Sequence, residues 1–509
     1  MARAIGTYEL LPTNEDTPLP TPAVQHDRFS WGPRNFCSRL FAFRRARYFL
    51  GFILLALCLL IPYRLYERHA SKYPPLYEKY HAKELALPQH NPDLPYPEGR
   101  EGKYLWVSAH LDGGFGWGNF MQELILDAYL AHKDGRAFVF DNYTWDRHGP
   151  EYSEYHGHLI PSRIPLTALL AGPIVGGPFP GVDHSPRSVR KEYFDTVCPD
   201  PVKIKGNDLI DTYVWGPTTI LVEKWLERLE LTNSKCIEVV EGSQQMFSLW
   251  TFGTTNVLSL WPDLVKSPII TGFRWSPLVE AGYAKNIPLI NPPSVTHPSH
   301  YGETYPYTAL GGLLALQIRR GDFEEHCVNL LNWGANWQGF NRFPELPDQF
   351  VAVPGAGTFN ISDEARAEHL KRCYPTPGQI ADRVREIMQT DAGRNLENVY
   401  IMTNGQPDFI AEVKEALRGV KAWGSIKSSR DLIVTREQDY VKQAIDMLIG
   451  IRAQVLIGNG WSSMSSNIVM LRMALVDLAP DHHRFWFDLH MLNLLAIAQS
   501  LANKIVQVV

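Results

Sequence analysis

The sequence predicts an α/β protein with two doubly wound, Rossmann-like domains that face a cleft, preceded by a transmembrane helix and a stem. Strand and helix patterns alternate over 104–141 and again over 313–475, and such alternation is typical of parallel sheets covered by helices. A length of 509 residues is greater than that of a typical single domain and indicates more than one hydrophobic core. A single uncharged apolar run near the N-terminus predicts the transmembrane helix.

That apolar run, "YFLGFILLALCLLIPY", covers residues 48–63. As a helix it would span roughly 24 Å, which is short but compatible with a thin bilayer. Several arginines precede it, so the positive-inside rule favours a cytoplasmic tail over 1–47 and a lumenal body. A cleaved signal peptide fits less well because the tail is long, and a buried core helix is the other alternative. Residues 64–100 are charged and rich in Tyr and Pro, which is typical of a stem.

The composition narrows the classes of protein and compartment. A net charge of -5 and a pI near 6.4 exclude the strongly basic surface typical of nucleic-acid-binding proteins. Cysteines in an oxidising lumen form disulfides, and pairing neighbours in sequence is the simplest arrangement. This arrangement gives Cys198–Cys236 and Cys327–Cys373, and no cysteine spacing indicates a zinc site. Sequons for glycosylation begin at Asn142 and Asn360.

Each of the two domains is predicted from its strands and helices. In the N-terminal domain, 101–310, a strand, a glycine-rich loop, a helix and a second strand follow one another over 104–141. The stretch 142–300 shows no clear pattern. In the C-terminal domain, 311–509, three apolar strands alternate with helices, the helix 439–448 leading into the last strand. These strands are "LLALQI" (313–318), "VYIM" (399–402) and "VLIG" (455–458), and the helices are 408–418, 439–448 and the segment after 467.

The glycine-rich loop "HLDGGFGWGN" of the N-terminal domain resembles a dinucleotide-binding turn. Its glycines, Gly114, Gly116 and Gly118, have G-x-G-x-G spacing, whereas the dinucleotide fingerprint requires G-x-G-x-x-G. A nicotinamide enzyme is also unusual in the secretory lumen. We therefore expect these glycines to let the backbone approach a ligand or the other domain closely.

The strand 313–318 ends in two adjacent arginines, Arg319 and Arg320, followed by Gly321 and Asp322. Ligands of parallel α/β sheets bind at the carboxyl ends of the strands, and a guanidinium fork suits phosphate oxygens. We expect one arginine to hold a phosphate while the other braces the loop. The alternative is a purely structural Arg–Asp pair.

A serine-rich turn, "GNGWSSMSSN", follows the strand 455–458. Free N–H groups at a helix N-terminus, together with serine hydroxyls, form a cradle for anions. The alternative is plain N-capping of the helix by Ser465 or Ser466. Together with Arg319 in the same domain, the turn predicts a site for a diphosphate ligand.

At these stretches the sequence resembles the GDP-fucose-dependent fucosyltransferases, namely the protein O-fucosyltransferases, including the fungal-type O-fucosyltransferase-like proteins, and the core α1,6-fucosyltransferase. Their H-x-R-R-x-D motif is matched by "QIRRGDF" (317–323), and their serine-rich turn by "SMSSNI" (463–468). "VYIMTN" (399–404) resembles their V-F-V-A-T-D strand, and Cys327 matches a cysteine after the arginine motif. Gln317 and Asn404 depart from the family's histidine and aspartate.

The resemblance implies a GT-B-like fold with the donor in the C-terminal domain. Arg319 would bind the β-phosphate of the donor and stabilise the departing GDP, so that no metal is needed. Asp446 would contact the guanine end. No acid matches an unambiguous position for the general base, and Asp112 in the glycine-rich loop is the nearest candidate, with a turn residue as the alternative. The implied donor site contains Gly116, Gly118, Asn119, Arg319, Arg320, Asp322, Asp446, Ser463, Ser465 and Ser466.

The expected function is that of an inverting, metal-independent fucosyltransferase in the Golgi or endoplasmic reticulum. It would use GDP-fucose as donor and a glycoprotein or glycan as acceptor, with no other cofactor. Two alternatives stay open: a transferase for another nucleotide sugar, and a catalytically silent lumenal protein that binds a nucleotide sugar or a glycan. The sequence does not name the acceptor.

Overall fold

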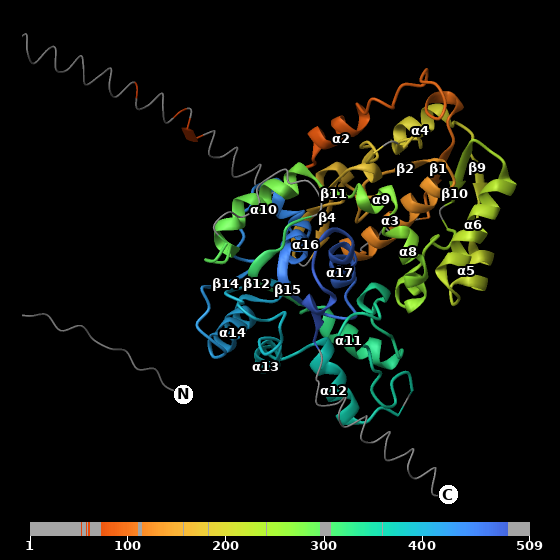
Figure 1. Ribbon diagram of the computed structural model, residues 1–509. Helices are drawn as coiled ribbons and strands as arrows, with labels where there is room; N and C mark the ends of the chain where they lie inside the picture. The colour runs from red at the N-terminus through yellow and green to blue at the C-terminus, as the bar shows by residue number, and fades with distance from the viewer. Residues whose placement is uncertain are drawn as a thin grey trace, which may run out of the picture. The chain divides into compact units, whose positions relative to one another are not determined.

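The computed structural model describes residues 73–109, 115–155, 157–181, 183–240, 242–295, 307–358 and 360–486, together with Phe52, Cys58, Leu60 and Ile61. The described residues from Tyr73 onward belong to one compact unit. This unit contains two five-stranded sheets, each entirely parallel. Figure 1 shows the strands of the two sheets in separate groups, with helices α3 (Trp117–Lys133) and α17 (Ser463–Leu475) between them. The α/β class and the parallel sheets are confirmed.

The first half of the unit is built on the sheet β8-β2-β1-β10-β9. Its central strand β1 is an apolar run buried on both faces, as expected for a parallel strand covered by helices. The strands are β1 (Tyr104–Val107), β2 (Ala137–Phe140), β8 (Val189–Arg190), β9 (Val202–Ile204) and β10 (Cys236–Val239). The helices of this half, besides α3, are α2 (Glu78–Leu85), α4 (Lys191–Val197), α5 (Asn207–Tyr213), α6 (Thr218–Thr232), α7 (Leu249–Phe252), α8 (Trp261–Leu264) and α9 (Pro268–Thr271).

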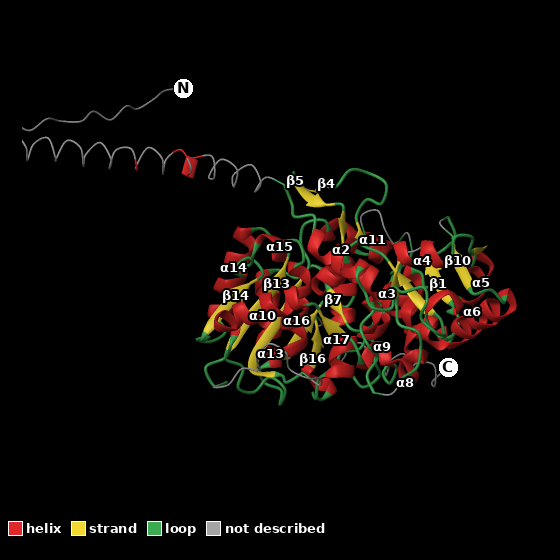
Figure 2. Ribbon diagram, turned by 90° about the horizontal axis from the view of Figure 1, so that it is seen from above, coloured by secondary structure: helices red, strands yellow, loops and turns green. Residues whose placement is uncertain are grey.

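The first half also contains short antiparallel pairs of strands outside its main sheet. Strands β4 and β5 form a hairpin that stands out from the layers of helices in Figure 2. The pairs are β3 (Tyr143–Thr144) with β6 (Arg163–Ile164), β4 (Tyr152–Tyr155) with β5 (His158–Pro161), and β7 (Leu170–Ala171) with β11 (Arg274–Trp275).

The second half is built on the sheet β14-β13-β12-β15-β16. Counted along the chain, its strands have the spatial order 3-2-1-4-5, so the winding direction reverses between β12 and β15. Ligands of doubly wound folds bind outside the carboxyl ends of the strands at such a switch point. The strands are β12 (Leu310–Ile318), β13 (Asn398–Thr403), β14 (Ser425–Ser428), β15 (Ala453–Gly458) and β16 (His483–Phe485). The helices, besides α17, are α11 (Phe323–Asn332), α12 (Asp363–Cys373), α13 (Pro377–Ile387), α14 (Pro407–Arg418), α15 (Arg436–Asp439) and α16 (Lys442–Arg452).

Helix α10 (Pro277–Ile290) precedes the expected domain boundary near residue 310 but contacts the second half. Asn286 donates to the Ile433 carbonyl at 3.0 Å, and its side-chain oxygen accepts from the Ile433 amide at 2.7 Å. Helix α10 therefore packs with the second half, although it comes from the stretch 142–300, where the sequence pattern is weak.

The expected stem, 64–100, is folded into the body from Tyr73 onward. Tyr77 is buried and donates to the Glu437 carbonyl at 2.5 Å. Glu84 is fully buried, accepts from the Thr167 amide at 2.8 Å and pairs with Arg190 at 3.4 Å. The prediction of a spacer is wrong for these residues because partners far along the chain bury a segment whose composition looks like a linker.

Among the described residues, no helix has the length and apolar character needed to cross a membrane. The predicted transmembrane segment 48–63 and the tail 1–47 lie almost entirely outside the described residues.

Candidate functional site

The carboxyl end of β12 places two adjacent arginines in different environments. Arg320 is buried, and its guanidinium lies between the rings of Tyr374, at 4.1 Å, and Phe409, at 3.8 Å. It also donates to the carbonyl of Pro375 and to that of Arg319. Burial lowers the pKa of Arg320 to about 10. Arg320 therefore braces the loop, in place of the donor contact that the resemblance implied.

Arg319 lies at the open side of the same loop. Its side chain is 32% exposed and donates to the half-exposed carboxylate of Asp322 at 3.0 Å. The guanidinium also lies 4.6 Å from the centre of the Phe323 ring. A carboxylate and a phosphate oxygen are interchangeable partners for a guanidinium, so an anionic ligand can take the place of Asp322.

Asn404, which follows β13, holds this loop in position. Its side-chain oxygen accepts from the Arg320 amide at 2.8 Å, while its Nδ2 donates to the Arg320 carbonyl at 2.7 Å and to Asp322 at 3.1 Å. Only an amide side chain both accepts and donates in this way. Sequence reasoning treated Asn404 as a departure from a motif. The available signal was that β12 and β13 are parallel, which brings their carboxyl ends together.

The N-terminus of α17 lies beside this loop, because β12 and β15 are neighbours in the sheet. The helix begins at Ser463, inside the serine run and earlier than the sequence pattern predicted. No side chain caps it, and the buried hydroxyl of Ser462 has no hydrogen-bond partner among the described residues. Uncapped N–H groups at a helix N-terminus are available to an anion.

The serines of α17 do not all face this open end. Ser465 donates to Gln317 at 2.9 Å, and Ser466 accepts from Gln122 at 2.9 Å. Both are fully buried, so these expected donor ligands serve the packing of α17 instead. Ser463 is half-buried and remains the serine suited to a ligand. Gln317, which stands where the family has histidine, thus links β12 to α17.

Helix α3 brings the first half against this end of α17. A Cβ on Gly118 would lie 2.6 Å from the Ser463 hydroxyl, so only glycine permits this approach. The Gly118 carbonyl accepts from Asn467 at 2.8 Å. Asn119 is half-buried in the next position, and Gly116 is exposed with open space around it. The loop residues 110–114, including the candidate base Asp112, lie outside the described residues.

Asp446 on α16 is buried behind the ends of β13 and β14. Its two carboxylate oxygens accept from Tyr400 at 2.5 Å and from Ser429 at 2.8 Å. Burial raises the pKa of Asp446 to about 6, although both hydrogen bonds favour the ionised form. Because both oxygens are engaged inside the protein, this geometry gives Asp446 a structural role and does not support the expected contact with guanine.

Each half contains one disulfide, Cys198–Cys236 in the first and Cys327–Cys373 in the second. These are the pairs of sequence neighbours. The two sequons differ in exposure. Asn360 is exposed, whereas the amide of Asn142 is half-buried, donates to Asp141 at 3.1 Å and accepts from Arg190 at 3.3 Å.

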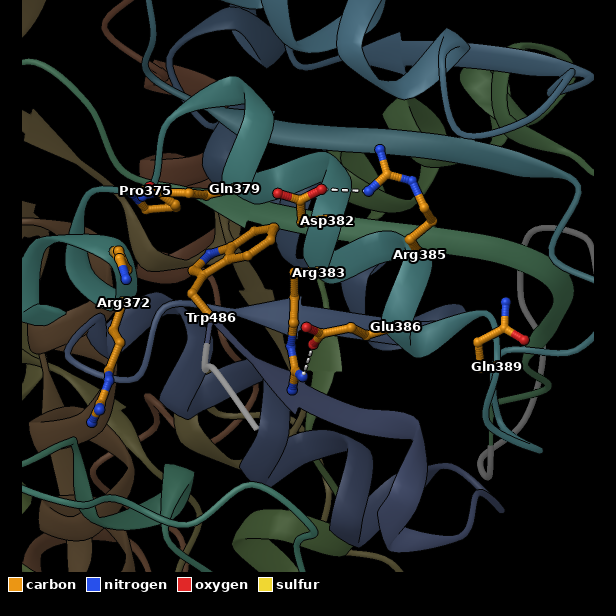
Figure 3. A pocket seen from close by; sticks show the side chains of 10 residues that line it. Arg372, Pro375, Gln379, Asp382, Arg383, Arg385, Glu386, Gln389 and Trp486 are labelled. Carbon is orange, nitrogen blue, oxygen red and sulfur yellow. Dashed lines mark hydrogen bonds and ion pairs between the residues drawn. The ribbon is translucent and has the colours of Figure 1, made fainter. Parts of the chain in front are cut away.

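A groove of about 670 Å³ opens on the outer face of α13 (Figure 3). Its charged side chains are paired with one another, as in Arg385 with Asp382 and Arg383 with Glu386. The start of α13 beside the groove is capped by Thr376, whereas the start of α17 has no side-chain cap. The groove therefore offers a diphosphate no free helix N-terminus, and the predicted site is the loop after β12. The groove is lined by Lys371, Arg372, Pro375, Gln379, Asp382, Arg383, Arg385, Glu386, Gln389 and Trp486.

Comparisons with known proteins give structural but no sequence matches. No family model matches the chain, and no curated protein matches it. A crystal structure of POFUT1 with GDP-fucose is similar to this chain with a TM-score of 0.45 at 15% identity, covering 75% of this chain and 98% of that chain. POFUT1 with GDP gives 0.43 at 15% identity and the same coverage. A mutant of Arabidopsis thaliana FUT1 with GDP gives 0.34 at 13% identity, covering 80% of this chain and 76% of that chain.

Proposed function

We propose that this chain is a glycosyltransferase that moves fucose from GDP-fucose to a protein hydroxyl or a glycan, with inversion at the anomeric carbon. The observation that carries the proposal is the placement of Arg319. Its guanidinium lies at the carboxyl end of β12, beside the uncapped start of α17, at the switch point of the second sheet. Positive charge and free N–H groups at such a point suit a diphosphate. The motif resemblance supplies the identity of the sugar.

In the proposed reaction an acceptor oxygen attacks the anomeric carbon of the donor, and the bond to the β-phosphate oxygen breaks. Charge then accumulates on GDP, and Arg319 would offset it without a metal. Binding of the donor would move the guanidinium from Asp322 to the diphosphate. Arg320 and Asn404 would keep the loop fixed during this exchange.

We also propose a lumenal location in the secretory pathway, with residues 48–63 as the anchor. The two disulfides support an oxidising compartment. The exposed sequon at Asn360 is consistent with it.

The test measures nucleotide release from a panel of nucleotide sugars by the purified full-length chain, with and without an acceptor extract and in the presence of EDTA. Among the nucleotide sugars, we expect only GDP-fucose to release its nucleotide, and we expect EDTA not to reduce this release. Release from another sugar would correct the donor, whereas GDP binding without release would support the silent binding protein.

A single substitution tests whether the loop after β12 binds the nucleotide. Arg319→Ala should lose GDP affinity while its unfolding temperature stays unchanged, because the side chain is partly exposed. Absence of GDP binding by the unaltered chain would contradict the proposal.

A further inference from the structure

His326 lies beside the arginine that we assign to the diphosphate. It follows Asp322 by four residues at the start of α11, and side chains at this spacing project from the same side of a helix. Asp322 in turn accepts from Arg319 at 3.0 Å. The imidazole therefore belongs to the immediate surroundings of the donor site.

Aromatic rings hold the His326 side chain in place. Its ring centre lies 5.1 Å from that of Phe323 and 6.0 Å from that of Trp333. Phe323 also contacts the Arg319 guanidinium, so one ring touches both groups. The imidazole is half-buried, and no hydrogen bond engages its nitrogens within the described part of the chain. One side of the ring thus stays available.

This side of α11 faces the first half of the protein. Tyr155, at the end of β4, has a pKa raised first by burial and then by the charge of Asp322, while Arg319 lowers it. Such effects require proximity, so Tyr155 of the β4–β5 hairpin lies near the Arg319–Asp322 pair.

The transfer reaction needs a group that takes the proton of the acceptor hydroxyl. In the structure both oxygens of Asp322 accept hydrogen bonds, from Arg319 and from Asn404, and the bond from Asn404 persists when Arg319 turns to the diphosphate, whereas the nitrogens of His326 have no such partner among the described residues. We propose that His326 is the proton acceptor of the transfer reaction, an inference that rests on the proposed function. As the acceptor oxygen bonds to the anomeric carbon, its proton passes to a ring nitrogen of His326. The electron pair of the broken bond leaves on the β-phosphate of GDP, and the imidazolium then releases its proton to water.

The surrounding charges couple this role to donor binding. Burial first, and the charge of Arg319 second, lower the pKa of His326, while Asp322 raises it. These are the charged groups that act on the imidazole within the described residues, and the packed rings of Phe323 and Trp333 carry none. The diphosphate would offset the charge of Arg319, so the imidazole becomes a stronger base when the donor is bound. By linkage, GDP binds more tightly as the pH falls through the titration of His326.

The experiment compares the full-length chain with His326→Gln and with a matched control, His81→Gln. His81 is a half-exposed histidine in the first half, hydrogen-bonded to Glu192 at 3.0 Å. GDP affinity is measured by calorimetric titration from about pH 5.5 to about pH 8, across the range where histidine titrates. GDP release from GDP-fucose is measured in parallel.

We expect His326→Gln to slow transfer by about 100-fold or more, the usual contribution of a general base. Its GDP affinity at high pH should match that of the unaltered chain, while its rise toward low pH should be weaker. His81→Gln should change neither quantity. A merely structural role for His326 would not alter the pH dependence of GDP binding.

Equal release rates and equal pH dependence in His326→Gln and the unaltered chain would overturn the proposal and leave the proposed function standing. Failure of the unaltered chain to bind GDP would overturn both. If His326→Gln unfolds at a lower temperature than the unaltered chain, His326→Asn decides by the same two measurements.

Discussion

The two sheets share one architecture but differ at the ends of their central strands. In the first half, Ser108 follows β1, and its hydroxyl lies 2.8 Å from the Glu238 carboxylate and 3.0 Å from the Val239 carbonyl. In the second half, β12 leads to Arg319, whose guanidinium is partly exposed. Both strands lie where the winding of their sheet reverses. Topology alone therefore does not select the half in which we propose nucleotide binding, whereas the charge at the strand end does.

The disulfides test whether the two halves are equally dependent on covalent links. The linked residues are 38 positions apart in the first half and 46 in the second. Loop-closure entropy then predicts a similar loss, about 4 kcal/mol, when either pair is changed to alanine. Chemical denaturation measures the loss. A clearly larger loss in the second half would mean that the complete burial of Cys327 and Cys373 outweighs loop closure.

The adjacent arginines give the next comparison, within the second half. Arg320→Met removes a buried, stacked and hydrogen-bonded group, so we expect the free energy of unfolding to fall by about 3 kcal/mol. Arg319→Met should leave stability within about 0.5 kcal/mol, as for ordinary surface changes, and remove GDP affinity. Denaturation and GDP titration check both variants. An exchange of these phenotypes would reverse the assignment of the two arginines.

Each half also buries a carboxyl group, Asp127 in the first and Asp446 in the second. Burial raises the pKa of both, that of Asp446 to about 6. Because the native state keeps the Asp446 proton to higher pH than the unfolded chain, stability falls as the pH rises from about 4.5 to about 7, by roughly 2 kcal/mol.

Asp446→Asn should lose this part of the pH dependence, measured as the free energy of unfolding against pH. Asp127→Asn should remove a separate part at higher pH, since the pKa of Asp127 is raised well above its ordinary value. Identical pH profiles for Asp446→Asn and the unaltered chain would show that Asp446 is not protonated in the native state.

The role of the Asn404 side-chain amide can be tested by replacing the residue with aspartate, which has almost the same shape. Asn404→Asp keeps the acceptor for the Arg320 amide but loses the two donated hydrogen bonds and places a charge beside Asp322. We expect a loss of about 1.5 kcal/mol in stability, together with weaker GDP binding. Unchanged GDP affinity in Asn404→Asp would show that ligand binding does not depend on the hydrogen bonds by which Asn404 holds this loop.

A substitution at the contact between α3 and the start of α17 is expected to have the smallest effect on stability. Gly118→Ala places a methyl group against the Ser463 hydroxyl, so we expect about 1 kcal/mol of destabilisation from overpacking. The double variant Gly118→Ala with Ser463→Gly removes the hydroxyl but leaves the added Cβ 2.9 Å from the Met464 amide nitrogen, so we expect denaturation experiments to show only partial recovery. Complete recovery would show that the Ser463 hydroxyl accounts for the whole clash.

Several features of the fold followed from local sequence. The apolar runs of β1, β2, β12, β13 and β15 mark strands because a parallel strand is buried on both faces and ends at polar or glycine-rich turns. The helical spacing of α3 and α14 is likewise a local property. The phosphate binding that we propose for the "RRGD" stretch also follows from residue types at the end of a strand.

The sequence by itself therefore determined the α/β class, the main strands of both sheets and the position of two adjacent arginines after β12, where we propose an anion site. Only the tertiary structure decided that Arg320 is buried, while Arg319, the arginine that the motif resemblance indicates as the phosphate ligand, is partly exposed. Arg319 and Arg320 have the same chemistry, and the rings that bury Arg320 come from Tyr374 and Phe409, far along the chain. The burial of Tyr77 and the membership of α10 in the second half were decided in the same way. Local sequence pattern does not reveal such choices, because they depend on the contact of residues that only the completed fold brings together.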